Sequence, residues 1–96
     1  MNQGTISLFG NELELNYNFD PQNLTAVVGL SVIGVTVLQH QVTVDQPLKI
    51  NPTINGFDKL DLVVSINKYP NGTNCLHAKW DLPAEGIQGD RDIVCC

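Results

Sequence analysis

The feature that most constrains the fold is a strict alternation of apolar and polar residues. Between positions 13 and 19 the odd positions are apolar, and the even positions carry acids or amides. Successive side chains of a β-strand point to opposite faces, so this pattern predicts a strand with one face in a core and the other in water. The apolar residues are Leu13, Leu15, Tyr17 and Phe19. A helix would repeat its apolar positions every three or four residues.

The same alternation recurs over residues 60–66 and 76–82, and turn-forming residues separate the segments. Asp20-Pro21 ends the first strand and Pro70-Asn71-Gly72 precedes the last, while Gly10-Asn11 predicts a two-residue hairpin turn. We therefore expect an all-β fold, a small antiparallel β-sandwich, immunoglobulin-like or a flattened barrel, of about seven short strands. The immunoglobulin likeness lies in strand count and patterning, because the Cys…Trp…Cys spacing of antibody domains is absent.

The alternation changes phase inside the longest apolar stretch, Leu24 to Leu38. Apolar residues occupy even positions from Leu24 to Val32 and odd positions from Ile33 to Val37. A one-residue slip reverses every side chain, so we expect a β-bulge at Gly34 or a bend that carries the chain to the other sheet. The many β-branched residues and two glycines of this stretch disfavour a helix.

The alternation ends after Pro83, where turn formers and charges outnumber apolar residues. We expect one domain over residues 1–96, in which residues 83–96 are a loose C-terminal extension or an edge strand ending in Ile93-Val94. A 96-residue chain buries enough surface to form a core without cross-links.

Charge and patterning limit the partners and the compartment. Ten acids against five scattered bases give a net charge of −5, which argues against nucleic acids and anionic membranes. The longest apolar stretch is too short and too polar for a membrane-spanning helix. The first ten residues do not resemble a secretory signal, so we expect a cytoplasmic protein, or a secreted one if a signal peptide was removed.

Side chains suited to catalysis or metal binding are sparse. Cys75 and His77 lie two residues apart on one strand face, and Cys95 and Cys96 could complete a zinc site. Structural zinc sites, however, use paired ligands two to four residues apart, and adjacent cysteines rarely reach one tetrahedral ion. Neither histidine stands beside a nucleophile and an orienting group. We therefore expect no catalytic residues, no metal and no cofactor.

Two function classes remain. Apolar residues on both faces of the 24–38 stretch exceed what one small core hides, and Val27 and Leu38 should emerge on the outside. This favours a non-catalytic interaction module that binds a protein partner or a second copy of itself through a sheet face or edge. The alternative is a small carbohydrate-binding domain. Its candidate residues are Tyr69 and Trp80 as stacking rings and Asn71 and Asn74 as hydroxyl partners, although Trp80 fits a core position better.

Overall fold

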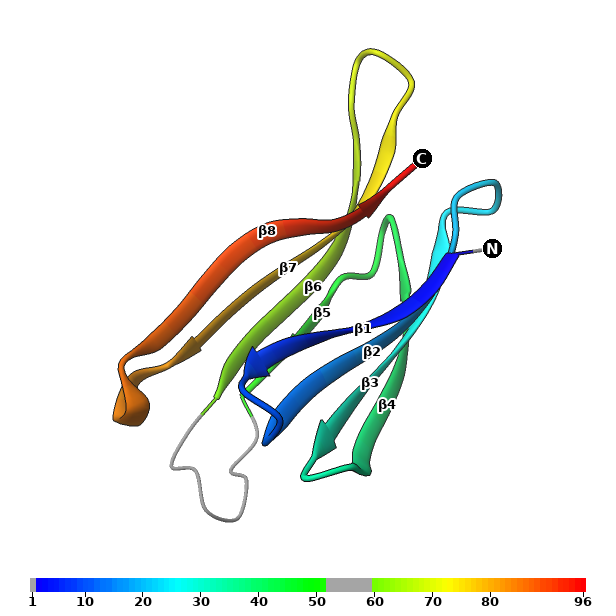
Figure 1. Cartoon of the computed structure of the whole chain (residues 1–96). Coiled ribbons are helices and arrows are strands. Elements are labelled where there is room, and N and C mark those ends of the chain that lie inside the picture. Colours follow the sequence, from blue (N-terminus) through cyan, green and yellow to red (C-terminus); the bar gives the residue numbers. More distant parts are fainter. Residues whose placement is uncertain (1, 52–59) are drawn as a thin grey trace.

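The computed structural model describes residues 2–51 and 60–96 and shows two four-stranded antiparallel sheets packed face to face (Figure 1). This is the expected β-sandwich. Among the described residues there is no helix with the length and apolar character needed to cross a membrane. The strands are β1 (Asn2–Phe9), β2 (Leu13–Asp20), β3 (Thr25–Val32), β4 (Val35–Thr43), β5 (Leu48–Ile50), β6 (Asp61–Lys68), β7 (Asn74–Leu82) and β8 (Ile87–Cys95).

Each sheet is a meander in which every strand pairs with its neighbours in sequence. Sheet A has the order β1-β2-β3-β4 and sheet B the order β5-β6-β7-β8. The long Greek-key connections of immunoglobulin domains do not occur in this order. The strands β1 and β8 lie side by side along one open side of the sandwich, and β4 lies against β5 and β6 along the other.

The core consists of the residues that the alternation assigns to the inner faces. Leu13, Leu15 and Phe19 of β2 are at most 1% exposed, and Tyr17 is half-buried against them. Sheet B contributes the inward residues of β6 and β7, which include Leu62 and Trp80. The strand pattern places one apolar face of each sheet against the other, so the expected inner faces of these strands are confirmed.

The C-terminal segment is ordered against sheet B as an edge strand, which agrees with the second of the two expectations for residues 83–96 and not with the loose extension. Residues Pro83–Glu85 form a single 3-10 turn closed by Gly86 in the left-handed conformation, and β8 then pairs antiparallel with β7. Most residues of this edge strand are exposed or half-buried, because it has a neighbouring strand on one side only. The strand count of the described residues is consequently eight.

Two turns differ from their predictions. The phase slip at Val32-Ile33-Gly34 is a two-residue hairpin turn within sheet A, with positive φ at Ile33 (50°) and Gly34 (77°). It is neither a bulge at Gly34 nor a crossing to the other sheet. The first hairpin has a three-residue turn, Gly10 to Glu12, in place of the two-residue turn, since Phe9 pairs with Leu13.

A β-bulge follows the turn of the β3–β4 hairpin and decides where the side chains of β4 point. Leu30 pairs with Leu38 and Ser31 with Thr36, so Val37 is an extra residue of β4. The bulge returns Leu38 to the inner side, where it packs half-buried against the core, and its expected outward position is therefore wrong. Val27 does lie on the outer face of sheet A, with 41% of its surface exposed.

Candidate functional site

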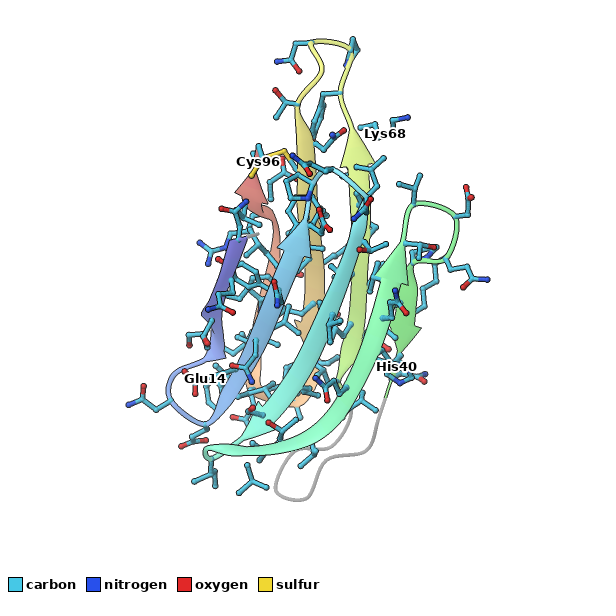
Figure 2. All side chains as sticks on the ribbon, turned by 90° about the vertical axis from the view of Figure 1, so that its right-hand side faces the viewer. Glu14, His40, Lys68 and Cys96 are labelled. Carbon is cyan, nitrogen blue, oxygen red and sulfur yellow. A yellow bond between two sulfur atoms is a disulfide. The ribbon has the colours of Figure 1, made fainter. Side chains whose placement is uncertain are left out.

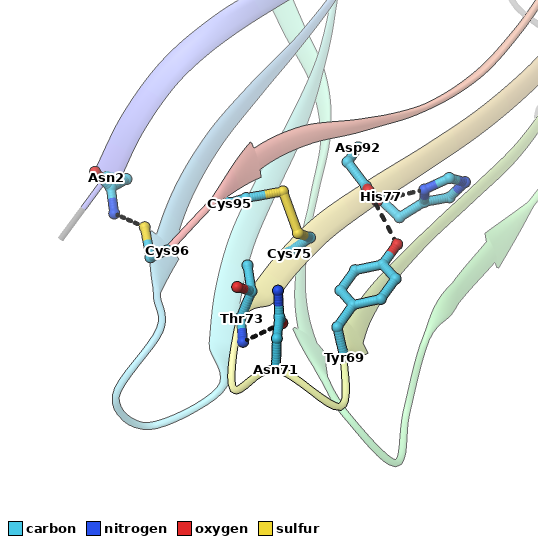
Figure 3. Close-up of a disulfide and its surroundings, with 9 residues drawn as sticks. All are labelled: Asn2, Tyr69, Asn71, Thr73, Cys75, His77, Asp92, Cys95 and Cys96. Carbon is cyan, nitrogen blue, oxygen red and sulfur yellow. Dashed lines mark hydrogen bonds and ion pairs between the residues drawn. A yellow bond between two sulfur atoms is a disulfide. The ribbon is translucent and has the colours of Figure 1, made fainter.

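Side chains that can carry chemistry gather on the outer face of sheet B near the start of β7 and the end of β8 (Figure 3). Cys75 pairs with Cys95 and forms a disulfide with it, while His77 pairs with Asp92. The register shifts between these two pairs, which makes Ile93 an extra residue of β8. Without that bulge, positions 92 and 95 would face opposite sides of the sheet. The bulge therefore places Asp92 on the same face as the disulfide.

Hydrogen bonds link this group into one cluster. The Nδ1 of His77 lies 2.8 Å from Oδ1 of Asp92, and its Nε2 contacts the carboxylate of Asp90. The hydroxyl of Tyr69, at the start of the β6–β7 loop, donates to Oδ2 of Asp92 at 2.9 Å. We call Tyr69, Cys75, His77, Asp92 and Cys95 the disulfide cluster. Asp90 borders it.

The two carboxylates favour the charged form of the imidazole. Burial lowers the pKa of His77, but the hydrogen bonds to Asp92 and Asp90 and the charges of both outweigh it and raise that pKa above its ordinary value. A neutral imidazole has one N–H, whereas the imidazolium donates to both carboxylates. The hydrogen bond to Asp92 also raises the pKa of the Tyr69 phenol.

The cluster contains atoms that can ligate a metal. The two Sγ atoms of Cys75 and Cys95 and a carboxylate oxygen of Asp92 lie within 4.8 Å of one another. Cys75 is buried, and the other two residues are exposed. Cys96 stands outside the disulfide, and its Sγ accepts a hydrogen bond from Nδ2 of Asn2 at 2.7 Å.

Of the residues expected for sugar binding, Tyr69, Asn71 and Asn74 lie at the turn between β6 and β7, but Trp80 does not join them. Trp80 faces the core with 8% exposed, and Tyr69 is 40% exposed and turned to Asp92. Asn71 accepts from the backbone N–H of Thr73 within its own turn. The backbone of Asn74 pairs with that of Cys96. The two aromatic rings therefore do not form a common stacking platform.

A second candidate surface is the outer edge of sheet A, formed by β4 (Figure 2). Within the described ranges β4 pairs with β3 alone, and β5 opposite it has only three residues. Most of β4 is consequently exposed, including Val35 at 63% and Val37 at 54%. The adjoining turn exposes Ile33 at 74%. We call Val35–Thr43 the β4 edge.

Comparison of the chain with family models, with curated proteins and with solved structures finds no match. The sequence had indicated Cys75 and His77 as neighbours on one face, but not the partners Asp90 and Asp92. These stand 13 and 15 residues from His77 and are brought to it by the pairing of β7 with β8.

Proposed function

We propose that the protein is a non-catalytic interaction module that pairs with a second copy of itself through the β4 edge. The observation that carries the proposal is a nine-residue edge strand, largely exposed, without a single Asp, Glu, Lys or Arg. Natural edge strands are normally protected by charge, proline, a bulge or cover, because their free backbone groups otherwise pair with another chain. Of these devices β4 has the bulge at Val37, which leaves Leu38 to Thr43 as a regular strand. Both edges of sheet B carry charge, with Lys49 on β5 and Asp90, Arg91 and Asp92 on β8.

The charge of the molecule favours an uncharged edge strand over other surfaces. Both edges of sheet A, β1 and β4, lack Asp, Glu, Lys and Arg, and β4 is the more exposed of the two. Each copy has a net charge of −5, so two copies repel unless they meet where acidic side chains are absent. The segment from Val35 to Val44 is such a place. Two β4 edges joined antiparallel would extend sheet A into one continuous eight-stranded sheet.

The sequence of β4 is nearly symmetric about His40, which suits a two-fold pairing. With the axis at His40, Gln39 lies opposite Gln41 of the second copy. Leu38 lies opposite Val42, and both stand on the inner face, so apolar contacts flank the two His40 side chains, which share that face because His40 pairs with the core residue Val28. Isologous contacts of this kind close into a dimer and do not propagate.

Two double variants test the pairing register. Gln39→Lys with Gln41→Lys places like charges opposite each other twice, whereas Gln39→Lys with Gln41→Glu places opposite charges there. Each cross-strand pair contributes about 0.2–1 kcal/mol, so we expect the first variant to raise the dimer Kd roughly 2- to 30-fold. The second should dimerise at least as well as the unchanged chain. Light scattering should give twice the 10.5 kDa of one chain for the unchanged protein at micromolar concentration.

A matched pair of single variants separates edge pairing from face pairing. Val37→Lys changes the β4 edge, and Val27→Lys changes the outer face of sheet A on the central strand β3. We expect Val37→Lys to shift the mass toward one chain and Val27→Lys to leave it unchanged. A monomeric unchanged protein would disprove the proposal. Dissociation by Val27→Lys but not by Val37→Lys would also disprove it, because the copies would then meet through the outer face of sheet A and not through the β4 edge.

A further inference from the structure

We propose that the reduced form of the protein binds one zinc ion through the thiolates of Cys75 and Cys95 and the carboxylate of Asp92. When Cys75 and Cys95 are oxidised to the disulfide, the disulfide cluster has no thiolates to bind the metal. This inference concerns the outer face of sheet B and is independent of the β4 edge.

The geometry of the folded sheet supplies the three ligands. Their donor atoms already lie within 4.8 Å of one another. In a tetrahedral zinc site, bonds of about 2.0–2.3 Å place sulfur and oxygen donors roughly 3.6–3.8 Å apart. Side-chain rotation therefore suffices, because the pairing of β7 with β8 and the bulge at Ile93 fix the backbone. Three protein ligands leave a fourth position for water or a partner's side chain.

The neighbours of Asp92 hold its carboxylate in place. Tyr69 donates to Oδ2, and Nδ1 of His77 lies 2.8 Å from Oδ1. Each carboxylate oxygen has a second lone pair for a metal. Hydrogen-bonded partners of this kind orient a ligating carboxylate, and their loss typically weakens metal binding 10- to 100-fold. Zinc suits the set because thiolates are soft ligands.

Opening the site requires a dithiol reductant. The S–S bond between Cys75 and Cys95 breaks, two electrons and two protons pass from the dithiol to the two cysteines, and the reductant becomes a disulfide. Zinc then displaces both thiol protons to solvent. A reducing cytoplasm would keep the pair as thiols, whereas an oxidising compartment would keep the disulfide. The same chain thus has a metal-binding and a metal-free form.

The experiment uses cobalt as the probe for zinc. The full chain is reduced, freed of reductant without air and titrated with Co²⁺. We expect thiolate-to-cobalt charge-transfer absorption together with the intense visible bands of tetrahedral cobalt, saturating at one equivalent and abolished by one equivalent of Zn²⁺. The oxidised chain is the matched control and should show neither band. Competition with a chromophoric chelator gives the zinc Kd of each variant.

Cys95 and Cys96 are adjacent in the sequence, so replacing each by serine shows which of the two thiolates binds the metal. Cys95→Ser should remove most of the charge-transfer absorption, and Cys96→Ser should retain it. Asp92→Asn and Tyr69→Phe should each raise the zinc Kd about tenfold or more while the disulfide-bonded forms stay folded. Absorption that depends on Cys96 in place of Cys95 would overturn the proposal. So would a reduced, metal-loaded chain that has lost its β-type circular dichroism, because the site depends on the sheet register.

Discussion

Gly89 lies beneath the indole ring of its cross-strand partner Trp80. Because Gly89 has no side chain, the ring can occupy the space above it. A Cβ added at Gly89 would stand 2.2 Å from Cζ2 of Trp80. Such a contact cannot exist, so a larger residue would displace the ring from the core. The absence of a side chain at one position of an edge strand therefore fixes the place of the largest core residue.

Gly89→Ala should lower the free energy of unfolding by about 1–3 kcal/mol, because overpacking forces the indole out of its position. Gly4→Ala is the matched control. Its added Cβ would meet the hydroxyl of Tyr17 at 2.7 Å, the far end of a half-buried side chain that can move. Urea unfolding measures both variants, and an equal loss at the two glycines would contradict the assigned packing.

Asp20 stabilises the turn between β2 and β3. Its Oδ2 accepts from the side-chain amide of Asn23 at 2.7 Å, and its Oδ1 accepts from the backbone N–H groups of Gln22 and Asn23. The hydrogen bond from the Asn23 side chain, together with those from the backbone, lowers the pKa of Asp20.

A lowered pKa makes the stability of this turn depend on pH. The contribution of Asp20 is complete above the ordinary carboxyl pKa of about 3.9 and is lost as the pH falls through the lower folded-state value. We expect the Tm of the unchanged protein to exceed that of Asp20→Asn at about pH 6, with the difference shrinking toward about pH 2. A difference in Tm that stays constant over this range would show that the carboxylate charge has no part in the turn.

At the level of elements, the turn of the β3–β4 hairpin contains a residue type that rarely adopts the backbone conformation found there. Ile33 has a φ of 50° and is 74% exposed, so it combines a branched side chain with a left-handed backbone and gains little packing. Two-residue turns of this type prefer Asn-Gly. The exposed valines that follow belong to the β4 edge.

Ile33→Asn should therefore raise the free energy of unfolding by about 1 kcal/mol, since it removes the left-handed penalty and touches no core residue. Gly34→Ala, at a φ of 77°, should lower it. Thermal unfolding by circular dichroism compares the two. A stabilising Gly34→Ala would mean that the turn adopts another geometry in solution.

The strands that were predictable from the sequence are those with one fully buried face. β2, β6 and β7 alternate cleanly because their inner residues meet the opposite sheet. The tail strand β8 was ambiguous because most of its residues are half-buried or exposed. The turn at Ile33 was missed because isoleucine is not a turn former. The positions of the disulfide and its neighbours depend on the β7–β8 register and on the bulge at Ile93. Both are determined by how the two strands pair, and the local sequence of either strand does not reveal them.

For the whole molecule, the two sheets share one core and should unfold together. Leu15 of sheet A and Leu62 of sheet B are each 1% exposed in the same apolar cluster. Trp80 belongs to sheet B and reports on it by fluorescence. A destabilising variant in sheet A should therefore shift the unfolding transition monitored by Trp80 fluorescence by the same amount as the unfolding transition monitored by circular dichroism.

Leu15→Ala and Leu62→Ala should each cost about 2–5 kcal/mol, through lost burial and a residual cavity. Glu14→Ala, on the outer face beside Leu15, should cost less than about 0.5 kcal/mol. Equal sensitivity of Glu14 and Leu15 would reverse the assigned faces. A tryptophan transition that Leu15→Ala leaves in place would show that the sheets unfold as separate units.

The meander topology also has a consequence for how the chain folds. Every strand pair joins sequence neighbours through a hairpin or a single connecting segment, so the entropy lost in closing each pair is small and folding should outpace that of Greek-key sandwiches of similar size. During synthesis, residues 2–43 complete sheet A before β6 leaves the ribosome. The nascent chain then presents the apolar inner face of sheet A to its surroundings until sheet B arrives to cover it.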